Sequence, residues 1–586
     1  MSLSSILPDQ QLAGALEEAF THEDNEYRGK PYMPLSGFPE SIAQARAWAV
    51  WGSTFGFHHD GERYLANPEA WTWHRLALQE FQRLHKTITW LRGPAGTGKT
   101  YELVSLSGSW DGMQWYLCPS NVACEVVRMQ MNERKVSHGD SVMTPHVRFE
   151  LAGANGWSGF PKWWPRPANA GKIAKSRLYV LDEVFFWDAR TLALSLACIP
   201  TGSIVVLAGD PLQNRPVDGC EIAYWLHTYS AQSVAAGSAS AAQMILGRAG
   251  RAADLPLGML DDIKHLDAGK TLSIELTQIR RSDRPAITAA REYLFARHQL
   301  PAEGEGLKIT RSESIEAAVQ LAVSRIRQGY RVVAPTNVLS LRIGGEFNRA
   351  ENVEGGAMSL DLGDSGTSTE LSDALYFRRG QSCMVLVNDH QFGLHNGLVC
   401  RYYRWHRPDG RSQKAWHEID VPVREQSGQL TSIRHQRYKL YYQPGKHSWV
   451  MSQPLSKLRQ EFGDDVVSAD LGSEQENACA GLLASPHALT NHRAQGSTFE
   501  KTLIVIPPHL GPWMCAEWLY VAISRAKTDV ELVFATDPKL TPQQQETLFK
   551  AQVERLTTQK LHAPDLFQAL KPAAEKTHSS PAAVAA

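Results

Sequence analysis

The 586-residue sequence lacks an excess of charge of either sign, because 60 Lys and Arg residues nearly balance 61 Asp and Glu residues. Without a global positive field, any contact with nucleic acid must come from a local basic groove. No apolar run approaches the roughly 18–20 residues that a membrane-spanning helix needs. Met1 to Gln11 also lack the basic start and apolar stretch of a secretion signal. These absences predict a soluble, cytoplasmic protein without a membrane partner.

Closely spaced cysteines are missing as well. No two cysteines form a C-x-x-C pair, and none lies near a pair of histidines. This spacing argues against a zinc site and against a dense disulfide framework, and it favours reduced thiols in a cytosolic setting. The eight cysteines are Cys118, Cys124, Cys198, Cys220, Cys383, Cys400, Cys479 and Cys515.

Short strand-like runs are what the sequence does contain. From Lys86 onward these runs alternate with turn signals and helical stretches, the pattern of a doubly wound parallel sheet. They fall into two groups separated by a long middle region, which predicts two α/β domains. The runs are Thr87–Leu91, Gln114–Cys118, Arg177–Leu181, Ser203–Ala208, Arg331–Ala334, Thr502–Ile506 and Val530–Phe534.

The expected domains follow from this pattern and from two interruptions. Residues 1–85, with expected helices at Ser41–Trp51 and Trp71–Leu84, have no assigned role. The first α/β domain is expected at 86–310 with an insertion at about 136–175, and Ala231–Gly250 within it is a flexible loop or a weak helix. The second is expected at 311–354 and 477–540, interrupted by a β-rich insertion at 355–476 and followed by a partly disordered tail at 541–586. Strands of that insertion are expected at Gln381–Val387, Leu398–Trp405, Ala415–Val421 and Tyr438–Gln443.

One glycine-rich segment fits G-x-x-x-x-G-K-[ST] at every position and follows a strand-like run: Gly93, Pro94, Ala95, Gly96, Thr97, Gly98, Lys99 and Thr100. Such a loop wraps phosphates with its backbone N–H groups, aided by the field of the following helix. Lys99 would bridge the β- and γ-phosphates, and the Thr100 hydroxyl would hold Mg²⁺. A chance glycine-rich turn is the alternative, and the complete match in this context disfavours it.

A second signal, a pair of acidic residues, follows the apolar run that ends at Leu181. Asp182 would support Mg²⁺ and Glu183 would polarise the attacking water, because side chains at the carboxyl ends of parallel strands face the ligand crevice. Taken alone, two acids at a strand end are often merely solvated. The phosphate-binding loop upstream favours the functional interpretation.

Five further motifs occur in a fixed order along the chain. Val205–Gln213 contains Gly-Asp-x-x-Gln, Leu276–Ser282 contains two arginines, and Val332–Asn337 is a strand followed by Pro-Thr-Asn. Thr490–Thr498 reads T-x-H-x-x-Q-G-S-T, and Tyr520–Lys527 contains V-A-x-S-R-A. Together with the phosphate-binding loop, these segments resemble the motifs of the superfamily 1 helicases. The resemblance covers roughly residues 86–310, 328–350, 376–400 and 485–535.

The resemblance implies an α/β fold with two RecA-like doubly wound parallel-sheet motor domains, a small subdomain inserted in the first and an SH3-like β insertion in the second. It implies ATP and Mg²⁺ as cofactors, Gln213 as a γ-phosphate sensor and Gly496 beside the nucleotide. Arg525 would act as an arginine finger, and Arg281, with Arg280 as its rival, would reach the γ-phosphate. The adenine-reading glutamine of the family has only Gln79 and Gln82 as candidates.

The branch of the superfamily is also implied by resemblance. The Gly-Pro-Ala-Gly-Thr-Gly-Lys-Thr loop, the H-x-x-Q-G-S-T ending at Thr498 and the Arg379–Asp389 segment are similar to the RecD-like and phage Dda-like group. That group moves 5′ to 3′ along single-stranded DNA. An ATP-driven DNA helicase of replication, repair or recombination is therefore expected.

Nucleic-acid contacts are expected across both motor domains. The candidates are Pro119, Ser120, Asn121, Thr144 and His146 in the first, and Thr336, Asn337, His492 and Ser497 in the second. Trp163 and Trp164 could form a pin that stacks on bases, or they could simply pack a small subdomain.

The expected partners are single-stranded and forked duplex DNA, together with a single-strand-binding or replication protein, and the chain is expected to act as a monomer. An RNA or RNA–DNA helicase is one alternative, and a nucleic-acid loader that uses ATP only as a switch is another.

Overall fold

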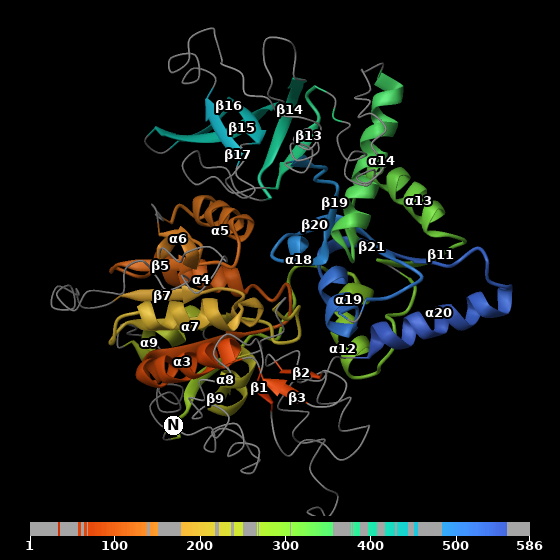
Figure 1. Cartoon of the computed structure of the whole chain (residues 1–586). Helices are drawn as coiled ribbons and strands as arrows, with labels where there is room; N and C mark the ends of the chain where they lie inside the picture. The colour runs from red at the N-terminus through yellow and green to blue at the C-terminus, as the bar shows by residue number, and fades with distance from the viewer. Residues whose placement is uncertain are drawn as a thin grey trace, which may run out of the picture. The chain divides into compact units, whose positions relative to one another are not determined.

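The structure is a computed structural model, shown in Figure 1. It describes residues 33–34, 57–59, 64–66, 68–136, 141–149, 177–216, 222–235, 240–249, 266–267, 269–304, 306–355, 377, 379–386, 397–406, 416–427, 430–442, 450–454, 483–511 and 513–558. The expected helix at 41–51 and most of the expected insertion at 136–175 lie outside these residues.

The described residues divide into two compact units. The first contains the described residues up to Ser120 together with those of Val127–Arg281, and the second contains Asn121–Val126 and Ser282–Thr558. The helices that follow Arg281 belong to the second unit because they pack there. The Ser282 hydroxyl donates a hydrogen bond of 2.6 Å to the Lys527 carbonyl, and the rings of Phe295 and Tyr520 meet with centroids 5.6 Å apart.

The first unit contains a seven-stranded sheet in the order β6-β5-β7-β8-β4-β10-β9, and all of its strand pairs are parallel. The predicted parallel sheet is thereby confirmed. The four runs expected here correspond to β4, β5, β7 and β8. In chain order the strands are β4 (Ile88–Arg92), β5 (Gln114–Leu117), β6 (Val142–Met143), β7 (Leu178–Leu181), β8 (Ile204–Gly209), β9 (Ala231–Ala235) and β10 (Thr271–Glu275).

The segment expected as a flexible loop or weak helix contains two regular elements. Ala231–Ala235 is the edge strand β9, which pairs with β10, so the expectation was wrong for these residues. Ala241–Arg248 forms helix α9, whose first turn is closed by a capping box between Ser240 and Gln243. All five residues of β9 form a strand here because each is paired with a residue of β10, which supplies the backbone partners.

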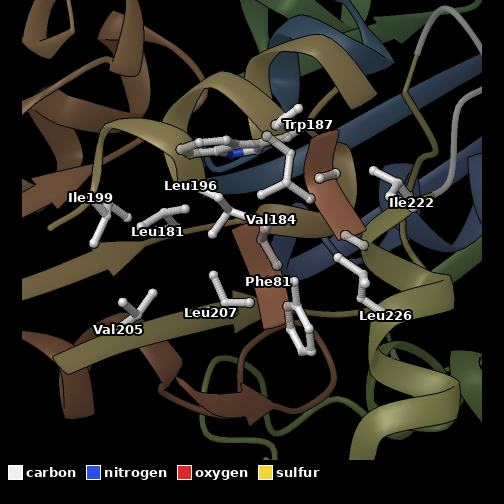
Figure 2. Close-up of a cluster of buried hydrophobic side chains, with 14 of the residues drawn as sticks. Phe81, Leu181, Val184, Trp187, Leu196, Ile199, Val205, Leu207, Ile222 and Leu226 are labelled. Atoms are coloured by element: carbon white, nitrogen blue, oxygen red, sulfur yellow. The ribbon is translucent and has the colours of Figure 1, made fainter. Parts of the chain in front are cut away.

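Helices cover both faces of this sheet. Phe81 of α3, Leu181 of β7, Leu196 of α7, and Val205 and Leu207 of β8 belong to one buried cluster (Figure 2). The alternate residues of these strands, such as Val180 and Val206, are buried as well. The helices are α3 (Pro68–Leu84), α4 (Lys99–Gly108), α5 (Asn121–Glu133), α6 (Pro145–Arg148), α7 (Ala189–Cys198), α8 (Ile222–Ser230) and α9, with short 3-10 turns η3 (His85–Thr87) and η5 (Val184–Phe186).

The second unit contains a five-stranded sheet in the order β11-β21-β20-β12-β19, again with parallel pairs throughout. Its strands are β11 (Leu307–Ser312), β12 (Tyr330–Ala334), β19 (Ala488–Thr490), β20 (Phe499–Ile506) and β21 (Ala526–Ala535). Its helices are α11 (Pro285–Thr288), α12 (Ala290–Phe295), α13 (Ile315–Arg327), α14 (Asn337–Gly355), α18 (Asn491–Ala494), α19 (Ala516–Ile523) and α20 (Pro542–Thr557). Helix α20 occupies the first part of the expected tail, where Thr541 and Gln544 close a capping box.

The β-rich insertion forms an antiparallel six-stranded sheet in the order β17-β16-β15-β14-β13-β18. The strands are β13 (Ser382–Val385), β14 (Val399–His406), β15 (Trp416–Ser427), β16 (Leu430–Tyr442), β17 (Val450–Pro454) and β18 (Leu483–Ala484). Four of them match the expected runs. A small sheet near the amino terminus joins β1 (Met33–Pro34), β2 (Phe57–His59) and β3 (Tyr64–Ala66). No helix in the described part of the chain has the length and hydrophobicity needed to cross a bilayer.

Candidate nucleotide and nucleic-acid sites

The glycine-rich loop joins β4 at the centre of the first sheet to helix α4. Gly96 and Gly98 adopt φ angles of 83° and 91°, a left-handed conformation that glycine reaches without strain. Lys99 begins α4 and is buried, and its ammonium donates hydrogen bonds of 2.7 Å to the Gly93 carbonyl and 3.2 Å to the Pro94 carbonyl. The backbone of the loop thus binds the buried ammonium group of Lys99.

The segment that follows β10 packs against this loop. The Arg280 amide donates a 2.7 Å hydrogen bond to the Gly96 carbonyl. A Cβ added at Gly96 would lie 2.7 Å from the Arg281 Cβ, and one added at Gly93 would lie 2.7 Å from the Leu276 carbonyl. The two candidate arginines therefore differ in their positions. The Cβ of Arg281 lies beside the loop, whereas the Arg280 side chain is exposed.

The two acids lie directly after β7. The Asp182 carboxylate accepts hydrogen bonds from the Tyr116 hydroxyl at 2.8 Å and from the Glu183 amide at 3.0 Å. Burial, and next the negative charge of Glu183, raise the pKa of Asp182, while the Tyr116 hydrogen bond and the nearby Lys99 charge oppose that rise. Glu183 adopts a left-handed φ of 52° that turns the chain into η5. A buried carboxylate and a nearby buried ammonium therefore lie at the carboxyl-terminal ends of the parallel strands.

Gly209, at the end of β8, lies against the turn that carries Glu183. A Cβ at Gly209 would lie 2.8 Å from Phe185 Cδ2 and 3.3 Å from the Val184 amide nitrogen. The following Asp210 is buried, and one of its carboxylate oxygens accepts a 3.0 Å hydrogen bond from the Leu212 amide. Gln213 is also buried, and its backbone N–H donates a 3.1 Å hydrogen bond to the Asp210 carbonyl.

The donor chemistry here fits Mg²⁺. The ion prefers oxygen ligands and usually combines one or two protein oxygens with phosphate oxygens and water. The Asp182 carboxylate and the Thr100 hydroxyl, at the start of α4, are oxygens of that kind. Among the residues that the structure describes, no group of three or more His, Cys, Asp or Glu could hold a metal ion.

In the second unit, hydrogen bonds hold the Arg525 side chain against its own motif and the preceding one. Its guanidinium donates to the Val521 carbonyl at 3.0 Å, the Ser497 carbonyl at 3.3 Å and the Ser524 hydroxyl at 2.9 Å. Gly496 precedes Ser497 with a left-handed φ of 82°. The two last motifs of the sequence are therefore in direct contact through Arg525.

The predicted nucleic-acid residues lie at strand ends and helix starts. Pro119 and Ser120 lie between β5 and α5, and Asn121 begins α5. Thr144 caps α6 by accepting a hydrogen bond from the Val147 amide. His146 on α6 is exposed.

In the second unit, the Thr336 hydroxyl accepts from the Leu339 amide in the first turn of α14, which Asn337 begins. Burial lowers the pKa of His492. Trp163 and Trp164 lie outside the described residues.

Tyr116 is the contact that the motifs alone missed. Its hydroxyl reaches Asp182 from the neighbouring strand, and only the pairing of β5 with β7 brings the two together. The sequence signal was limited to a tyrosine within a strand-like run. Gln79 and Gln82, the adenine candidates, are part of α3, and the Gln79 side chain is exposed.

Comparisons with known proteins address both units. The model of the AAA domain family matches residues 75–236, and that of the UvrD-like helicase C-terminal domain matches residues 486–533. No match was found among curated proteins.

Several solved helicase structures align with most of the chain. One is a structure of two coordinating Pif1 helicases at forked double-stranded DNA. Its helicase chain is 17% identical to this chain, the alignment covers 81% of this chain and 94% of the Pif1 chain, and the TM-score is 0.38. Pif1 from Bacteroides with ADP-AlF3 and single-stranded DNA shares 15% over 81% and 95%, with a TM-score of 0.35. Pif1 from Candida albicans shares 14% over 82% and 97%, with a TM-score of 0.35. All three TM-scores are below 0.5.

The two matched families occur in the order in which the motifs run along the chain. The AAA domain match contains the glycine-rich loop and both acids, and the helicase C-terminal match contains the segments around Gly496 and Arg525. The first family accounts for a nucleotide-binding domain and the second for a helicase motor domain. These two matches confirm the resemblance found in the sequence and support a superfamily 1 helicase.

Proposed function

We propose that the protein is an ATP-dependent DNA helicase that moves 5′ to 3′ along single-stranded DNA and separates duplex strands. The observation that carries the proposal is the gathering of Lys99, Asp182 and Arg281 around one loop. The Lys99 ammonium is buried within the loop, its charge acts on Asp182, and the Arg281 Cβ approaches Gly96. Phosphoryl transfer needs positive charge and a metal-binding carboxylate in this combination.

Each residue has a distinct role in the proposed hydrolysis. Lys99 holds the β- and γ-phosphates, and Thr100 with Asp182 would hold Mg²⁺, which would neutralise phosphate charge when bound. Glu183 orients a water molecule and accepts its proton as the water oxygen attacks the γ-phosphorus and the bond to the ADP oxygen breaks. Arg281 and Arg525 stabilise the charge on the γ-phosphoryl oxygens. Gln213 senses the γ-phosphate.

Movement follows from splitting these groups between two motor domains. Residues of the first domain bind the nucleotide, and Arg525 belongs to the second, so closure depends on ATP and opening follows hydrolysis. Strand contacts at Ser120, His146, Thr336 and His492 then alternate between tight and loose. The contact between Arg525 and Ser497 supports a link from ATP state to strand contact.

The sequence resemblance is the basis for the finer parts of this proposal. These are the preference for DNA, the 5′-to-3′ polarity, a monomeric state, a single-strand-binding partner protein, and a cytoplasmic setting in replication, repair or recombination. The decisive assay compares duplexes that carry a 5′ or a 3′ single-stranded tail, with wild-type protein and Lys99→Ala. Unwinding only of the 5′-tailed duplex, and only by the wild type, is expected. Unwinding of the 3′-tailed duplex alone would reverse the proposed polarity.

A second assay separates the remaining activities. ATP turnover should rise more with single-stranded DNA than with RNA of the same sequence at matched salt concentration. Stronger stimulation by RNA would make the protein an RNA helicase. Turnover stimulated by DNA without strand separation on either tailed duplex would instead make it a translocase or loader.

A further inference from the structure

We propose that Tyr116 is a positioning residue that fixes the Asp182 carboxylate for binding of the nucleotide-associated metal ion. This inference rests on the proposed function, since it needs Asp182 as a ligand of Mg²⁺. Tyr116 itself touches neither nucleotide nor metal in the proposed mechanism. It acts through the orientation of the carboxylate.

The register of two neighbouring strands creates the contact. Tyr116 of β5 pairs with Val180 of β7, and Asp182 follows two residues after Val180. The Asp182 amide donates a 2.9 Å hydrogen bond to the Leu117 carbonyl, which extends this pairing past the end of β7. Backbone pairing therefore fixes the position of Asp182 relative to Tyr116 before either side chain is considered.

The side chains then fix the direction of the carboxylate. Oδ2 accepts the Tyr116 hydroxyl at 2.8 Å, and Oδ1 accepts the Glu183 amide at 3.0 Å. Tyr116 is 2% exposed and Asp182 is 7% exposed, so water has little access to replace either donor. An ionised carboxylate has about four lone-pair sites, and two donors leave further acceptor capacity on its oxygens. The carboxylate is thus held in one orientation while still able to bind a cation.

The burial of Tyr116 alone does not explain why its hydroxyl bonds to Asp182. A buried tyrosine hydroxyl usually finds some hydrogen-bond acceptor, and a backbone carbonyl would satisfy it as well. Here the acceptor is the one carboxylate that the motif assigns to the metal. Partners of this kind orient metal ligands, and their loss typically lowers metal affinity by about 10–100-fold. Tyr116→Phe removes the hydroxyl and keeps the ring, so it tests the hydrogen bond and not the packing.

The experiment measures metal dependence of nucleotide binding, without turnover. The affinity for a fluorescent ADP analogue is titrated in EDTA and then across Mg²⁺ concentrations for the full-length protein. For Tyr116→Phe, we expect the affinity in EDTA to stay within twofold of the wild type. The Mg²⁺ concentration for half-maximal enhancement should rise about 10–100-fold. Tyr179→Phe is the matched control, because it removes the same hydroxyl from a buried tyrosine of β7 and should leave the Mg²⁺ dependence unchanged.

A double variant decides whether Tyr116 acts through Asp182. If it does, Tyr116→Phe adds nothing to the effect of Asp182→Asn, and the two changes are strongly non-additive. Additive effects, or a Mg²⁺ dependence within twofold of the wild type in Tyr116→Phe, overturn the inference while Asp182→Asn still supports the proposed site. A normal Mg²⁺ dependence in Asp182→Asn overturns the metal assignment of the proposed function, and the positioning role with it. Thermal unfolding of each variant checks that the fold is retained.

Discussion

Replacing Gly209 by alanine should damage catalysis without removing any catalytic group. The added Cβ would lie 2.8 Å from Phe185 Cδ2, whereas carbon atoms in contact prefer about 3.5–4.0 Å. Phe185 is 8% exposed, and its ring stacks on that of Trp90 with centroids 5.9 Å apart. The ring therefore has no open space behind it. A displacement of roughly 1 Å must be taken up by the turn itself.

The turn that must move carries Glu183. Val184 N would be 3.3 Å and Glu183 Cα 3.5 Å from the new Cβ, so the strain acts directly on the backbone of the proposed base. Overpacking of this kind typically costs about 1–3 kcal/mol of stability. A misplacement of about 1 Å at a reacting group can lower the rate about 10²-fold. We expect Gly209→Ala to show both effects while nucleotide affinity stays within a few-fold of the wild type.

The assay pairs steady-state ATP turnover with thermal unfolding and with binding of a fluorescent ADP analogue. Gly344→Ala is the matched control: its Cβ would lie 2.7 Å from the Ser485 Cβ in the second unit, a similar overlap away from Glu183. It should destabilise the protein without a comparable loss of turnover per folded molecule. Turnover above half of the wild-type rate in Gly209→Ala would refute the close-approach reasoning. Equal losses in both variants would show a general effect of overpacking.

Three further predictions concern charge. Lys99→Ala should abolish ATP turnover while the fold is retained, and normal turnover would remove the assigned loop from the site. Arg525→Ala should cut hydrolysis by roughly 10³-fold or more with nucleotide binding largely retained; near-normal turnover would exclude Arg525. Burial, and next the charge of Arg92, lower the pKa of His227 from 6.5 to about 3. Because the unfolded chain takes up this proton first, stability is full above pH 6.5 and falls as the pH drops towards 3. At pH 5 the loss is about 2 kcal/mol. His227→Phe should therefore lose less stability than the wild type between pH 7 and pH 5, and an identical loss would show that His227 contributes nothing.

The residues that the sequence assigns to the nucleotide site share a local signal. Gly93 to Thr100 are contiguous, and Asp182 follows a run of buried apolar residues, so neither assignment needed the tertiary structure. The parallel pairing of both sheets followed from the same alternation of strands and helices. The strand bounds in these two sheets differ from the expected runs by at most about four residues, whereas β15 and β16 of the β-rich insertion extend further than expected.

Strand β10 shows why other elements were missed. Thr271–Glu275 alternates polar and apolar residues yet is buried, because its polar groups bond to specific distant partners. Trp90 Nε1 donates to the Thr271 hydroxyl at 3.0 Å, and His227 Nε2 lies 3.2 Å from the Ser273 hydroxyl. Composition cannot anticipate partners so far away in sequence. The bond from Tyr116 to Asp182 was hidden for the same reason.

The Gly93 and Pro94 carbonyls are the loop's own acceptors for the Lys99 ammonium. An ammonium buried without acceptors would be strongly destabilising, so these two carbonyls make the lysine compatible with a dry interior. The conformation of the glycine-rich backbone is therefore tied to the lysine that the loop contains, because turning either carbonyl away would take a partner from a buried charge.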